Sequence, residues 1–598
     1  MELDALAMDA VAMNTVATNS AATDTVSALL ADGAAEAERG GPSLAPLAAL
    51  LRQAGVRLRQ PMRVAVAGQI KRGKSTLVNA LLGERVAATG QLELTLTVNE
   101  LRHGDEPSVT IHYKNATAPQ RVSVARFREF TVHPGGGAGS AERMARLAQI
   151  RKVEYALPNA LLRAFRLIDT PGLGSVHGVD SQNTAAFLGI SDLADTAEQS
   201  RLTGLLSASG RTASDVHRAS AEEIDRADAV LYLFSRALHE RDRTAVDEFS
   251  GPAEGSMTPL KAFGVLSRCD QYWPPAQGLP GDPDPMTYDP MAVAEALAAR
   301  CLDRREIRRL FFTVLPTAGL VGLGAAGLTA EQFCWLADLA RTEPRRVLVR
   351  HLRDVGMFAG AAQPTGVTLP AEQRRALMEE LGPWGVHLAC GYLRDGLGEQ
   401  EVRERLLADS GVTRLRELIV GHFGNRASLI KLDHGLREAT AEIGRRRLAA
   451  HESGACAPEQ LGAVADRLQA LRGRVHGFAE LAALSRYYNG ELDLTDPEIG
   501  RLLQVTGERG TSCAARVGLP ERASAREIEQ SARRLVQTWA ARALDPTLDR
   551  RTAPVVRTMR QSCERIEERA RRARLLLETT DESALELDWP GSGEEAPR

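Results

Sequence analysis

The stretch from Met62 to Gly83 constrains the fold of this chain more than any other part of its sequence. It begins with the apolar run Val64–Ala67, whose composition is typical of a strand buried on both faces. The letters GQIKRGKS follow and match the phosphate-loop pattern G-x-x-x-x-G-K-[ST]. The next residues, up to Leu82, have the composition of a helix, and Gly83 stands where such a helix would end. A strand, a glycine-rich loop and a helix in this order predict a phosphate-binding site.

Each residue type in the loop has a physical role in binding phosphate. Gly68 and Gly73 let backbone N–H groups surround phosphate oxygens, and the N-terminus of the helix adds partial positive charge. Lys74 reaches the β- and γ-phosphates, and the hydroxyl group of Ser75 is a ligand for Mg²⁺. An ordinary glycine-rich turn is the alternative, but such a turn does not require this strand–loop–helix context. The phosphate-binding residues predicted in this stretch are Gly68, Lys71, Gly73, Lys74, Ser75 and Thr76.

A second motif, LIDTPG at Leu167–Gly172, predicts a site for the metal and the γ-phosphate. An aspartate at the carboxyl end of a strand beside the phosphate-loop strand is placed to hold Mg²⁺ through water, which gives Asp169 this role. The N–H group of Gly172 is placed to bond the γ-phosphate. The alternative is an ordinary turn at a strand end, and the phosphate loop upstream makes it the weaker interpretation.

A third motif, Ala262–Asp270, predicts which base the site binds. GTPases carry [NT]-K-x-D after a strand of this kind, and this chain has S-R-C-D. The carboxylate of Asp270 accepts hydrogen bonds from N1 and N2 of guanine, which adenine does not supply. Ser267 stands for Asn or Thr, and Arg268 stands for Lys, since a planar guanidinium stacks on a base at least as well. The motif predicts guanine, whereas a chance S-R-C-D would leave an ATP-driven P-loop enzyme.

Two shorter signals complete the predicted site. After a strand at 311–315, the loop with Thr317 and Ala318 brings a backbone N–H group toward guanine O6. A threonine between the first two motifs has to bind Mg²⁺ and close over the γ-phosphate, and we prefer Thr95 because Thr97 begins the next strand. The predicted Mg²⁺ ligands are Ser75, Thr95 and Asp169, and the residues predicted at the reacting phosphate are Lys74, Thr95 and Gly172.

The order of the apolar runs predicts the domain organisation. From 62 to 320, β-branched runs alternate with longer helical or polar stretches, as in a mostly parallel sheet with helices on both faces. Beyond 345 only helical periodicity remains, so we predict an α/β P-loop GTPase domain followed by an all-α helical bundle. The predicted parts are a disordered arm at 1–42, the GTPase domain at 43–345, the helical bundle at 346–580 and an acidic tail at 581–598.

Apolar stripes at helical spacing predict how the second half of the chain packs. One stripe, of coiled-coil character, predicts a single long helix over 457–485, and another predicts a helix over 415–450. Farther on, Val555–Thr579 is an Arg-rich helix whose interleaved glutamates predict a solvated, salt-bridged face rather than a membrane surface. The first stripe consists of Leu461, Val464, Leu468, Leu471, Val475, Phe478, Leu481 and Leu484.

Composition and charge exclude several classes of protein. A net charge of −3 in 598 residues argues against a nucleic-acid binder, which would carry a strongly basic domain. The seven cysteines are scattered without a C-x-x-C pair, as in a reducing compartment. No basic residue precedes Arg39, so we expect no secretory or transit signal. The longest uncharged run, Leu310–Ala330, contains Pro316 and four glycines, and we interpret it as a buried strand followed by a loop rather than a membrane span.

Together these motifs resemble the GTPase domain of dynamin-like large GTPases. The letters GQIKRGKSTLVNALLG, TGQLELTLT, LIDTPGLGSVH, ADAVLYLF and VLSRCD are closest to the bacterial branch, and within it to the actinobacterial isoniazid-inducible type. The resemblance extends from 60 to 580. It implies a GTPase head on a helical neck and trunk, with GTP as substrate and Mg²⁺ as cofactor. Such proteins dimerise through their heads, and many remodel membranes.

The resemblance also sets expectations for partners and location. We expect a homodimer, or a pair with a related dynamin-like GTPase, joined through the GTPase heads. We expect a cytoplasmic protein that meets the inner face of the cell membrane only as a peripheral protein. Nucleic acid is not an expected partner.

Departures from the family pattern concern hydrolysis rather than binding. Dynamins proper use a Gln and a Ser in the phosphate loop to place the attacking water and a charge-compensating cation, where this chain has Ile70 and Lys71. Leu173 follows D-T-P-G, where small GTPases keep a water-orienting Gln, and Glu93 stands where the family often has Pro. We therefore expect hydrolysis to depend on the assembly of two heads. The rival hypothesis is a slow GTP-binding switch or scaffold that acts through a protein partner without membrane remodelling.

Overall fold

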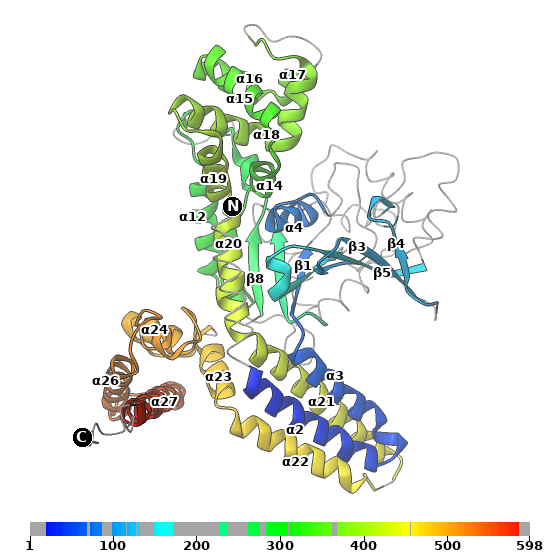
Figure 1. The fold of residues 1–598 in the computed structure, drawn as a ribbon, viewed down its shortest axis with the longest axis vertical. Helices are drawn as coiled ribbons and strands as arrows, with labels where there is room; N and C mark the ends of the chain where they lie inside the picture. Colours follow the sequence, from blue (N-terminus) through cyan, green and yellow to red (C-terminus); the bar gives the residue numbers. More distant parts are fainter. Residues whose placement is uncertain are drawn as a thin grey trace, which may run out of the picture. The chain divides into compact units, whose positions relative to one another are not determined.

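Figure 1 shows the structure, a computed structural model of the chain. The structure describes residues 20–68, 72–86, 98–114, 117–126, 130, 149–170, 226–235, 261–275, 283–308, 310–360, 367–454, 456–488 and 490–584. The chain divides into two compact units, Met1–Ala465 and Asp466–Arg598.

Among the described residues, a nine-stranded sheet forms the centre of the first unit, in the order β4-β3-β5-β2-β6-β1-β7-β8-β9. Neighbouring strands are parallel from β6 through β1, β7 and β8 to β9, and also between β2 and β5. The pairs β2–β6, β3–β5 and β3–β4 are antiparallel. The prediction of a mostly parallel sheet with helices is therefore confirmed. The strands are β1 (Met62–Gly68), β2 (Val98–His103), β3 (Ser108–Tyr113), β4 (Gln120–Val122), β5 (Ile150–Leu157), β6 (Phe165–Asp169), β7 (Ala229–Phe234), β8 (Ala262–Leu266) and β9 (Val314–Pro316).

Strand β5 does not correspond to any apolar run, and its composition explains why. Ile150 and Val153 are buried, but Lys152 between them is charged and only half-buried. The amino group of Lys152 donates to Glu100 on the neighbouring β2 at 2.6 Å, and Arg166 on β6 donates to the same carboxylate at 3.0 Å. These ion pairs stabilise charged side chains on one face of the sheet, so a strand forms without an apolar run.

The register of β1 brings two of the predicted motifs together. β1 pairs in parallel with β6, which sets Val66 opposite Asp169, and with β7, which sets Gly68 opposite Leu233. In an open parallel sheet, ligands bind outside the carboxyl ends of the strands. The phosphate loop, which follows Gly68, therefore begins beside Asp169.

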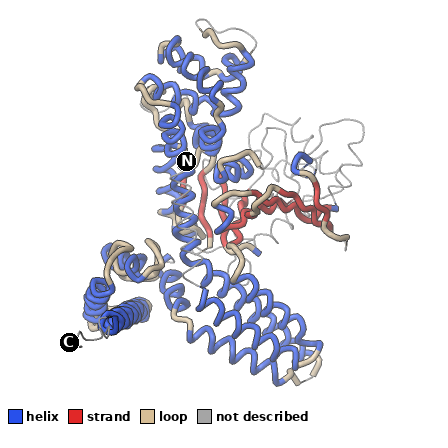
Figure 2. Tube along the Cα trace, in the orientation of Figure 1, coloured by secondary structure: helices blue, strands red, loops and turns tan. Residues whose placement is uncertain are grey.

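Helices cover the sheet and extend beyond it at both ends of the first unit. Figures 1 and 2 show a cluster of α15, α16, α17 and α18 beyond one end, and a bundle of α2, α3 and α21 beyond the other. The helices of this unit are α2 (Ser20–Arg39), α3 (Ala45–Leu58), α4 (Lys74–Leu82), α7 (Leu161–Ala164), α12 (Pro290–Leu302), α13 (Arg305–Arg308), α14 (Gly319–Gly327), α15 (Ala330–Thr342), α16 (Arg345–Arg353), α17 (Val355–Ala359), α18 (Ala371–Arg394), α19 (Glu399–Asp409), α20 (Val412–Leu418) and α21 (Asn425–Glu452). A π-helix, Ile419–Gly424, joins α20 to α21, and α22 (Glu459–Arg474) crosses into the second unit.

The hydrophobic core that contains α4 and β8 also contains residues from far beyond the predicted boundary at 345. Leu415 of α20 and Phe423 of the π-helix are fully buried in the same cluster as Leu77 of α4 and Phe263 of β8. The rings of Phe263 and Phe423 stack with their centroids 4.3 Å apart. The predicted boundary therefore does not match the packing, because helices after the last strand return to the sheet and complete its core.

The prediction that residues 1–42 form a disordered arm is wrong for Ser20–Arg39, which form α2. Leu30, Ala34 and Ala37 are buried, and α2 packs along α3. The Ala- and Thr-rich composition suggested disorder, but a narrow apolar face is enough when another helix covers it. Residues 1–19, the rest of the predicted arm, lie outside the described residues.

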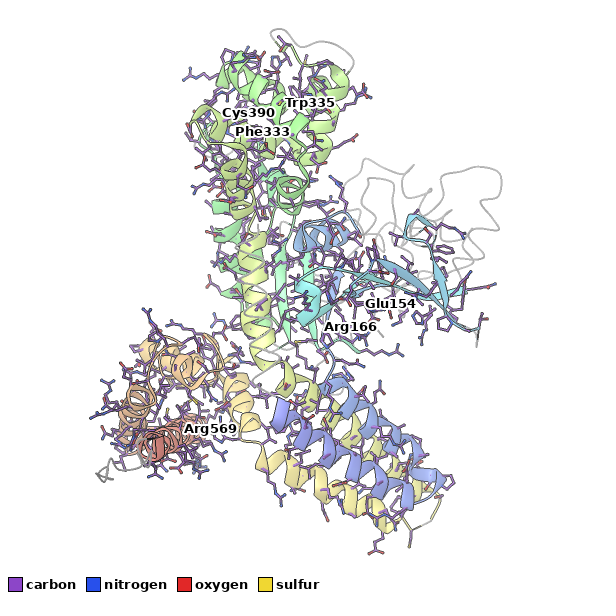
Figure 3. All side chains as sticks on the ribbon, viewed as in Figure 1. Glu154, Arg166, Phe333, Trp335, Cys390 and Arg569 are labelled. Atoms are coloured by element: carbon purple, nitrogen blue, oxygen red, sulfur yellow. The ribbon has the colours of Figure 1, made fainter. Side chains whose placement is uncertain are left out.

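The run Leu310–Ala330 contains a strand as predicted, but the predicted loop after the strand is the helix α14. Its glycines allow close packing rather than a loop, since a Cβ atom at Gly324 would lie 2.4 Å from the carbonyl oxygen of Glu380. Figure 3 labels Phe333 and Trp335 of α15 and Cys390 of α18, which belong to the hydrophobic cluster that α14, α15 and α18 share.

Within the described residues, no single helix has the length and apolarity to span a membrane. Helices α14 and α15 pass that test only together, and they meet at a bend of 113°.

The long helix predicted over 457–485 is interrupted, because α22 ends at Arg474 and α23 begins at Gly477. Gly473 and Gly477, both weak helix formers, flank the break. The predicted stripe is buried on both sides of the break, and Val475 within it is half-buried. The stripe is therefore core, as predicted, but it belongs to two helices.

The second unit contains the Arg-rich helix. Trp539 of α26 is fully buried where α26 packs along α27, and Figure 3 labels Arg569 on α27. Arg574 pairs with Glu529 across the two helices at 2.9 Å, so the predicted salt-bridged face is confirmed. The helices of this unit after α22 are α23 (Gly477–Tyr488), α24 (Asp496–Val505), α25 (Cys513–Arg516), α26 (Ala525–Ala543) and α27 (Thr552–Ala584).

Candidate nucleotide-binding site

Lys74 lies at the centre of the candidate site, at the first position of α4. Gly73 precedes it in the left-handed region, with φ of 83°, which turns the chain from the loop into the helix. The amino group of Lys74 donates to the carbonyl oxygen of Gly68 at 3.1 Å, so the side chain folds back over the loop. Burial lowers the pKa of Lys74 to about 8, although the carboxylate of Asp169 acts in the opposite direction. A buried cation of this kind is suited to a polyanionic ligand.

Ser75 and Asp169 form the second part of the site. The Ser75 hydroxyl donates to Oδ2 of Asp169 at 2.8 Å, although the two residues come from α4 and the end of β6. Asp169 is fully buried, and its Oδ1 atom has no hydrogen-bond partner among the described residues. Burial raises the pKa of Asp169 to about 6, with Lys74 and Ser75 acting against this shift.

These atoms fit the Mg²⁺ ion that a nucleotide would bring. A hydroxyl group and a carboxylate are oxygen ligands of the kind that Mg²⁺ prefers, and the unpartnered Oδ1 of Asp169 leaves a buried negative atom for a cation or its water. Ser75 and Asp169 are therefore together, as the sequence predicts. Thr95, the third predicted ligand, lies outside the described residues, as do Lys71 and Gly172.

The base motif is tied to the phosphate loop through Ser267. Its hydroxyl donates to the carbonyl oxygen of Arg72 at 2.8 Å and lies 3.1 Å from the carbonyl oxygen of Phe234 at the end of β7. A small side chain with one hydroxyl group therefore joins the loops after β1, β7 and β8. This contact gives Ser267 a structural role at the position where the GTPase motif [NT]-K-x-D has Asn or Thr.

Arg268 and Asp270, the two residues predicted to bind the base, lie close to the phosphate loop and to each other. Arg268 has φ of 59°, in the left-handed region, and its Nε atom would lie 3.8 Å from a Cβ atom at Gly73. The guanidinium stem therefore passes beside the phosphate loop. Burial raises the pKa of Asp270 to about 6, and Arg268 acts against this shift. A carboxylate beside a planar cation can accept hydrogen bonds from a base while the cation stacks on it.

The loop after β9 packs against the base motif but differs from the prediction at Ala318. Thr317 donates its N–H group to Leu266 at 2.8 Å and accepts one from Cys269 at 3.2 Å, which holds the two loops together. The N–H group of Ala318, a predicted partner for guanine O6, instead donates to the carbonyl oxygen of Ser410 at 2.9 Å. The N–H group of Ala318 is therefore already hydrogen-bonded to the segment between α19 and α20 in this conformation.

The sequence did not predict that Arg416 supports the site. From α20, Arg416 donates through Nε to the carbonyl oxygen of Leu81 at 2.9 Å and through Nη2 to that of Ala80 at 2.6 Å. These carbonyls lie in the last turn of α4, where backbone acceptors have no helical partner. Arg416 and Ser410 come more than 300 residues after the phosphate loop, and no motif marks them.

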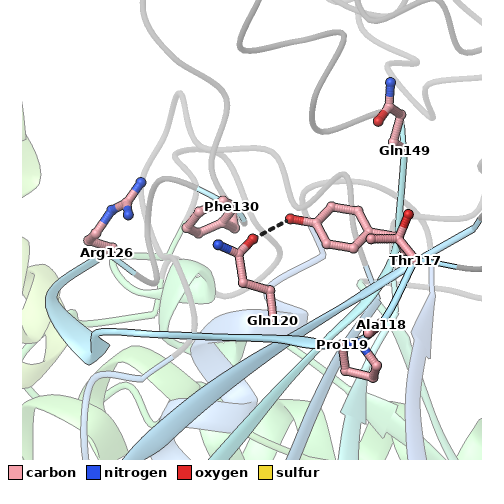
Figure 4. Close-up of a pocket in the computed structure, with 8 residues that line it drawn as sticks. Thr117, Ala118, Pro119, Gln120, Arg126, Phe130 and Gln149 are labelled. Carbon is pink, nitrogen blue, oxygen red and sulfur yellow. Dashed lines mark hydrogen bonds between the residues drawn. The ribbon is translucent and has the colours of Figure 1, made fainter.

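Two hollows lie outside the motifs. One, of about 650 Å³, is lined by residues of β3, β4 and their neighbours, with the Tyr113 hydroxyl donating to Gln120 at 2.8 Å (Figure 4). The other, of about 510 Å³, lies next to the loop after β9 and is lined by Pro316, His387 and Gly411 among others. Neither hollow contains a residue predicted for nucleotide binding.

Comparisons with known proteins agree with this geometry. Residues 64–249 match the model of the Dynamin family. The chain is also 30% identical over 545 residues to isoniazid-induced protein IniC of Mycobacterium tuberculosis, which covers 90% of this chain and 97% of that protein. The chain belongs to the dynamin family. The family predicted from the sequence motifs is thereby confirmed, and its members are GTPases.

Two further relatives of this dynamin-family chain extend the comparison. The bacterial dynamin-like protein of Nostoc punctiforme is 34% identical over 120 residues, which are 19% of this chain and 17% of that protein. A solved structure of an oligomerised bacterial dynamin pair aligns over 92% of this chain and 75% of that chain, with 13% identity and a TM-score of 0.27.

Proposed function

We propose that this chain binds and hydrolyses GTP at the site built from Lys74, Ser75, Asp169 and Asp270. The observation that carries the proposal is the buried contact between Ser75 and Asp169 beside Lys74, with one carboxylate oxygen of Asp169 left without a partner among the described residues. A cation, an Mg²⁺ ligand pair and a base-reading carboxylate on neighbouring loops are the parts that a GTPase needs.

Each residue has a defined task in this proposal. The amino group of Lys74 exchanges the carbonyl oxygen of Gly68 for oxygens of the β- and γ-phosphates. Ser75 and Asp169 would hold Mg²⁺, and a bound Mg²⁺ would supply positive charge beside the phosphates. Asp270 accepts hydrogen bonds from guanine, and Arg268 stacks on the base. Among residues outside the described ranges, we propose that Thr95 completes the metal site.

We further propose that hydrolysis depends on the pairing of two GTPase heads, in a homodimer or with a related dynamin-like GTPase. Ile70 and Leu173 are apolar at the positions where polar side chains orient the attacking water in related GTPases. A second head would order the loops over the γ-phosphate and exclude water, with Lys71 and Gly172 at the reacting phosphate. Membership of the dynamin family supports the remaining step, in which assembly acts on a membrane as a peripheral protein.

A slow GTP-binding switch is the second candidate, and the bond between Ala318 and Ser410 favours it. This bond links the base loop to α19 and α20, so nucleotide binding can change the position of these helices without rapid turnover. A protein partner would then bind one position of α19 and α20 in preference to the other. The two candidates share the nucleotide site and differ in the rate of hydrolysis.

The test of the proposed function is phosphate release from GTP and from ATP, with the variants Ser75→Ala and Asp169→Ala. We expect GTP to be the preferred substrate and both variants to lose hydrolysis, because each removes a metal ligand. Ser123→Ala and Asp105→Asn, at exposed positions outside the site, are matched controls and should behave as the wild type. Equal rates with ATP, or full activity of Asp169→Ala, would contradict the proposal.

A further inference from the structure

One face of α16 consists of exposed arginines. Arg346, Arg350 and Arg353 are spaced by four and three residues, so they lie along one side of the helix. We call these three residues the α16 arginine face. The opposite side of the helix carries Leu348 and Leu352, which are fully buried in the core shared with α15 and α18. The helix is therefore held in place by its apolar side, and its basic side is directed outward.

The α16 arginine face differs from the other Arg-rich helix of the chain. On α27, Arg572 pairs with Glu568 at 2.7 Å and Arg574 with Glu529 at 2.9 Å, so neighbouring carboxylates neutralise much of its charge. Among the described residues, the three side chains of the α16 arginine face make no ion pair. Their charge is therefore available to a partner.

Exposed apolar side chains follow directly on α17. Val355 is 41% exposed and Met357 is 59% exposed, whereas Phe358 next to them is buried and anchors the short helix. Asp354 caps α17 through the N–H group of Met357 at 2.9 Å, which fixes the turn between the two helices. Figure 1 shows α16 and α17 in the helical cluster at the end of the first unit away from α2 and α3. Three exposed arginines of α16 are thus followed, within four residues of Arg353, by two exposed apolar side chains on the next helix.

We propose that the α16 arginine face, with Val355 and Met357, is a docking surface for a membrane rich in anionic lipid. Arginines on one side of a helix attract anionic headgroups, while apolar side chains beside them enter the boundary between headgroups and acyl chains. The combination distinguishes a membrane from an acidic protein or a nucleic acid, which do not need an exposed methionine. The proposal rests on the membrane part of the proposed function and assigns it to a defined surface of the first unit.

The experiment measures flotation of the full chain with vesicles of phosphatidylcholine alone and of phosphatidylcholine with 30% phosphatidylglycerol (about one lipid in three, a strongly anionic surface). We expect binding to the anionic vesicles only, and weaker binding at high salt. The triple variant R346Q/R350Q/R353Q should bind about 100-fold more weakly at low salt. The charge-preserving variant R346K/R350K/R353K should bind as the wild type, because lipid attraction needs the charge and not the guanidinium.

Two further variants complete the test. Met357→Ser should weaken vesicle binding while leaving the charge unchanged. R569Q/R571Q/R572Q removes three charges from α27 and is the matched control, and we expect it to bind as the wild type. Undiminished vesicle binding of the α16 triple glutamine variant, or loss of binding only in the α27 variant, would overturn the proposal. So would a change in self-association of the α16 variant without a change in vesicle binding.

Hydrolysis of GTP, measured without vesicles on the same samples, separates this inference from the proposed function. The three arginines lie outside the nucleotide site, so the α16 variant should hydrolyse GTP as the wild type does. Normal hydrolysis without any vesicle binding by the wild type would overturn the docking surface together with the membrane step of the proposed function, and would leave GTP hydrolysis in place. Vesicle binding that is undiminished in the α16 triple glutamine variant would overturn the docking surface alone. Absence of hydrolysis in the wild type would instead contradict the proposed function.

Discussion

The backbone N–H group of Ala318 donates a hydrogen bond of 2.9 Å to the carbonyl oxygen of Ser410. Ala318 belongs to the loop after β9, beside the base motif, and Ser410 lies between α19 and α20. Arg416, two turns farther along, caps the C-terminal end of the phosphate-loop helix. The segment Ser410–Arg416 therefore contacts the loop after β9 and the C-terminal end of the phosphate-loop helix, and it continues through the π-helix into α21.

The close approach at Gly411 predicts a large effect of a small substitution. Gly411 has φ of 74°, and a Cβ atom there would lie 2.5 Å from the carbonyl oxygen of Pro316. Gly411→Ala should lower both the free energy of unfolding and the affinity for GTP. Gly396→Ala is the matched control, because Gly396 has φ of 87° but open space around it. We expect the control to cost about 1–2 kcal/mol and Gly411→Ala to exceed it by about 1–3 kcal/mol, as measured by chemical denaturation; equal costs would contradict the role of this contact.

Removing the cap on α4 should destabilise the head. Arg416→Ala leaves the carbonyl groups of Ala80 and Leu81 without their charged donor, and we expect a loss of about 2–3 kcal/mol in the free energy of unfolding. Arg414→Ala is the control, since Arg414 pairs with Glu295 at an exposed position and should cost about 0–1 kcal/mol. Denaturant titration of both variants measures the difference. Similar stabilities of the two variants would show that the cap does not stabilise the head.

The affinity for GTP and Mg²⁺ should be greatest between pH 6 and pH 8. Burial raises the pKa values of Asp169 and Asp270 to about 6, so below this pH both carboxyls bind a proton and lose affinity for Mg²⁺ and guanine. Burial lowers the pKa of Lys74 to about 8, so above this pH the free site loses its cation. Binding of a fluorescent GTP analogue across pH 5–9 measures both limbs. Lys74→Arg should remove the alkaline limb, and an affinity that stays constant across this range would contradict the assignment.

The same carboxyl shifts give the pH dependence of stability of the free protein. A carboxyl whose pKa is higher in the folded state than in the unfolded chain, near 3.9, binds its proton more tightly when folded. Asp169 and Asp270 should therefore lower the free energy of unfolding as the pH rises from about 4 to about 6. Above about pH 6 these two carboxyls should cause no further loss. Asp169→Asn should flatten this part of the profile in chemical denaturation. A profile unchanged by the substitution would contradict the burial of a carboxyl at this position.

Asp270 should decide which base is bound. Asp270→Asn removes the acceptor for guanine N1 and N2, and losing a charge-assisted contact of about 1.5–3 kcal/mol should lower GTP affinity by roughly tenfold or more. The variant should gain affinity for xanthosine nucleotides, which present an acceptor where guanine presents a donor. Competition binding with GTP, XTP and ATP tests this. If the wild type binds ATP as tightly as GTP, the guanine assignment is wrong whatever the variant does.

Short contiguous motifs made it possible to predict from the sequence that the residues of the candidate site lie together. Lys74, Ser75 and Asp169 lie in segments whose letters specify both a local shape and a chemistry, and the parallel pairing of β1 with β6 brings them together. The contacts of Ser410 and Arg416 could not be predicted, because they depend on the return of a helix to the sheet over 300 residues later. For the same reason the predicted boundary at 345 divides a single core. The segment that forms α2 was assigned to a disordered arm because its apolar face is narrow and becomes buried only when α3 packs against it.

The dependence of GTP turnover on protein concentration is the most direct test of the proposed mechanism. Phosphate release per head should be slow at nanomolar protein, because Ile70 and Leu173 leave an isolated head without a polar side chain to orient water. It should rise with concentration and level off as heads pair, and Asp169→Ala should abolish the rise. A turnover per head that stays constant from nanomolar to tens of micromolar protein would contradict assembly-dependent hydrolysis and leave a self-sufficient monomer or a switch that awaits a different partner.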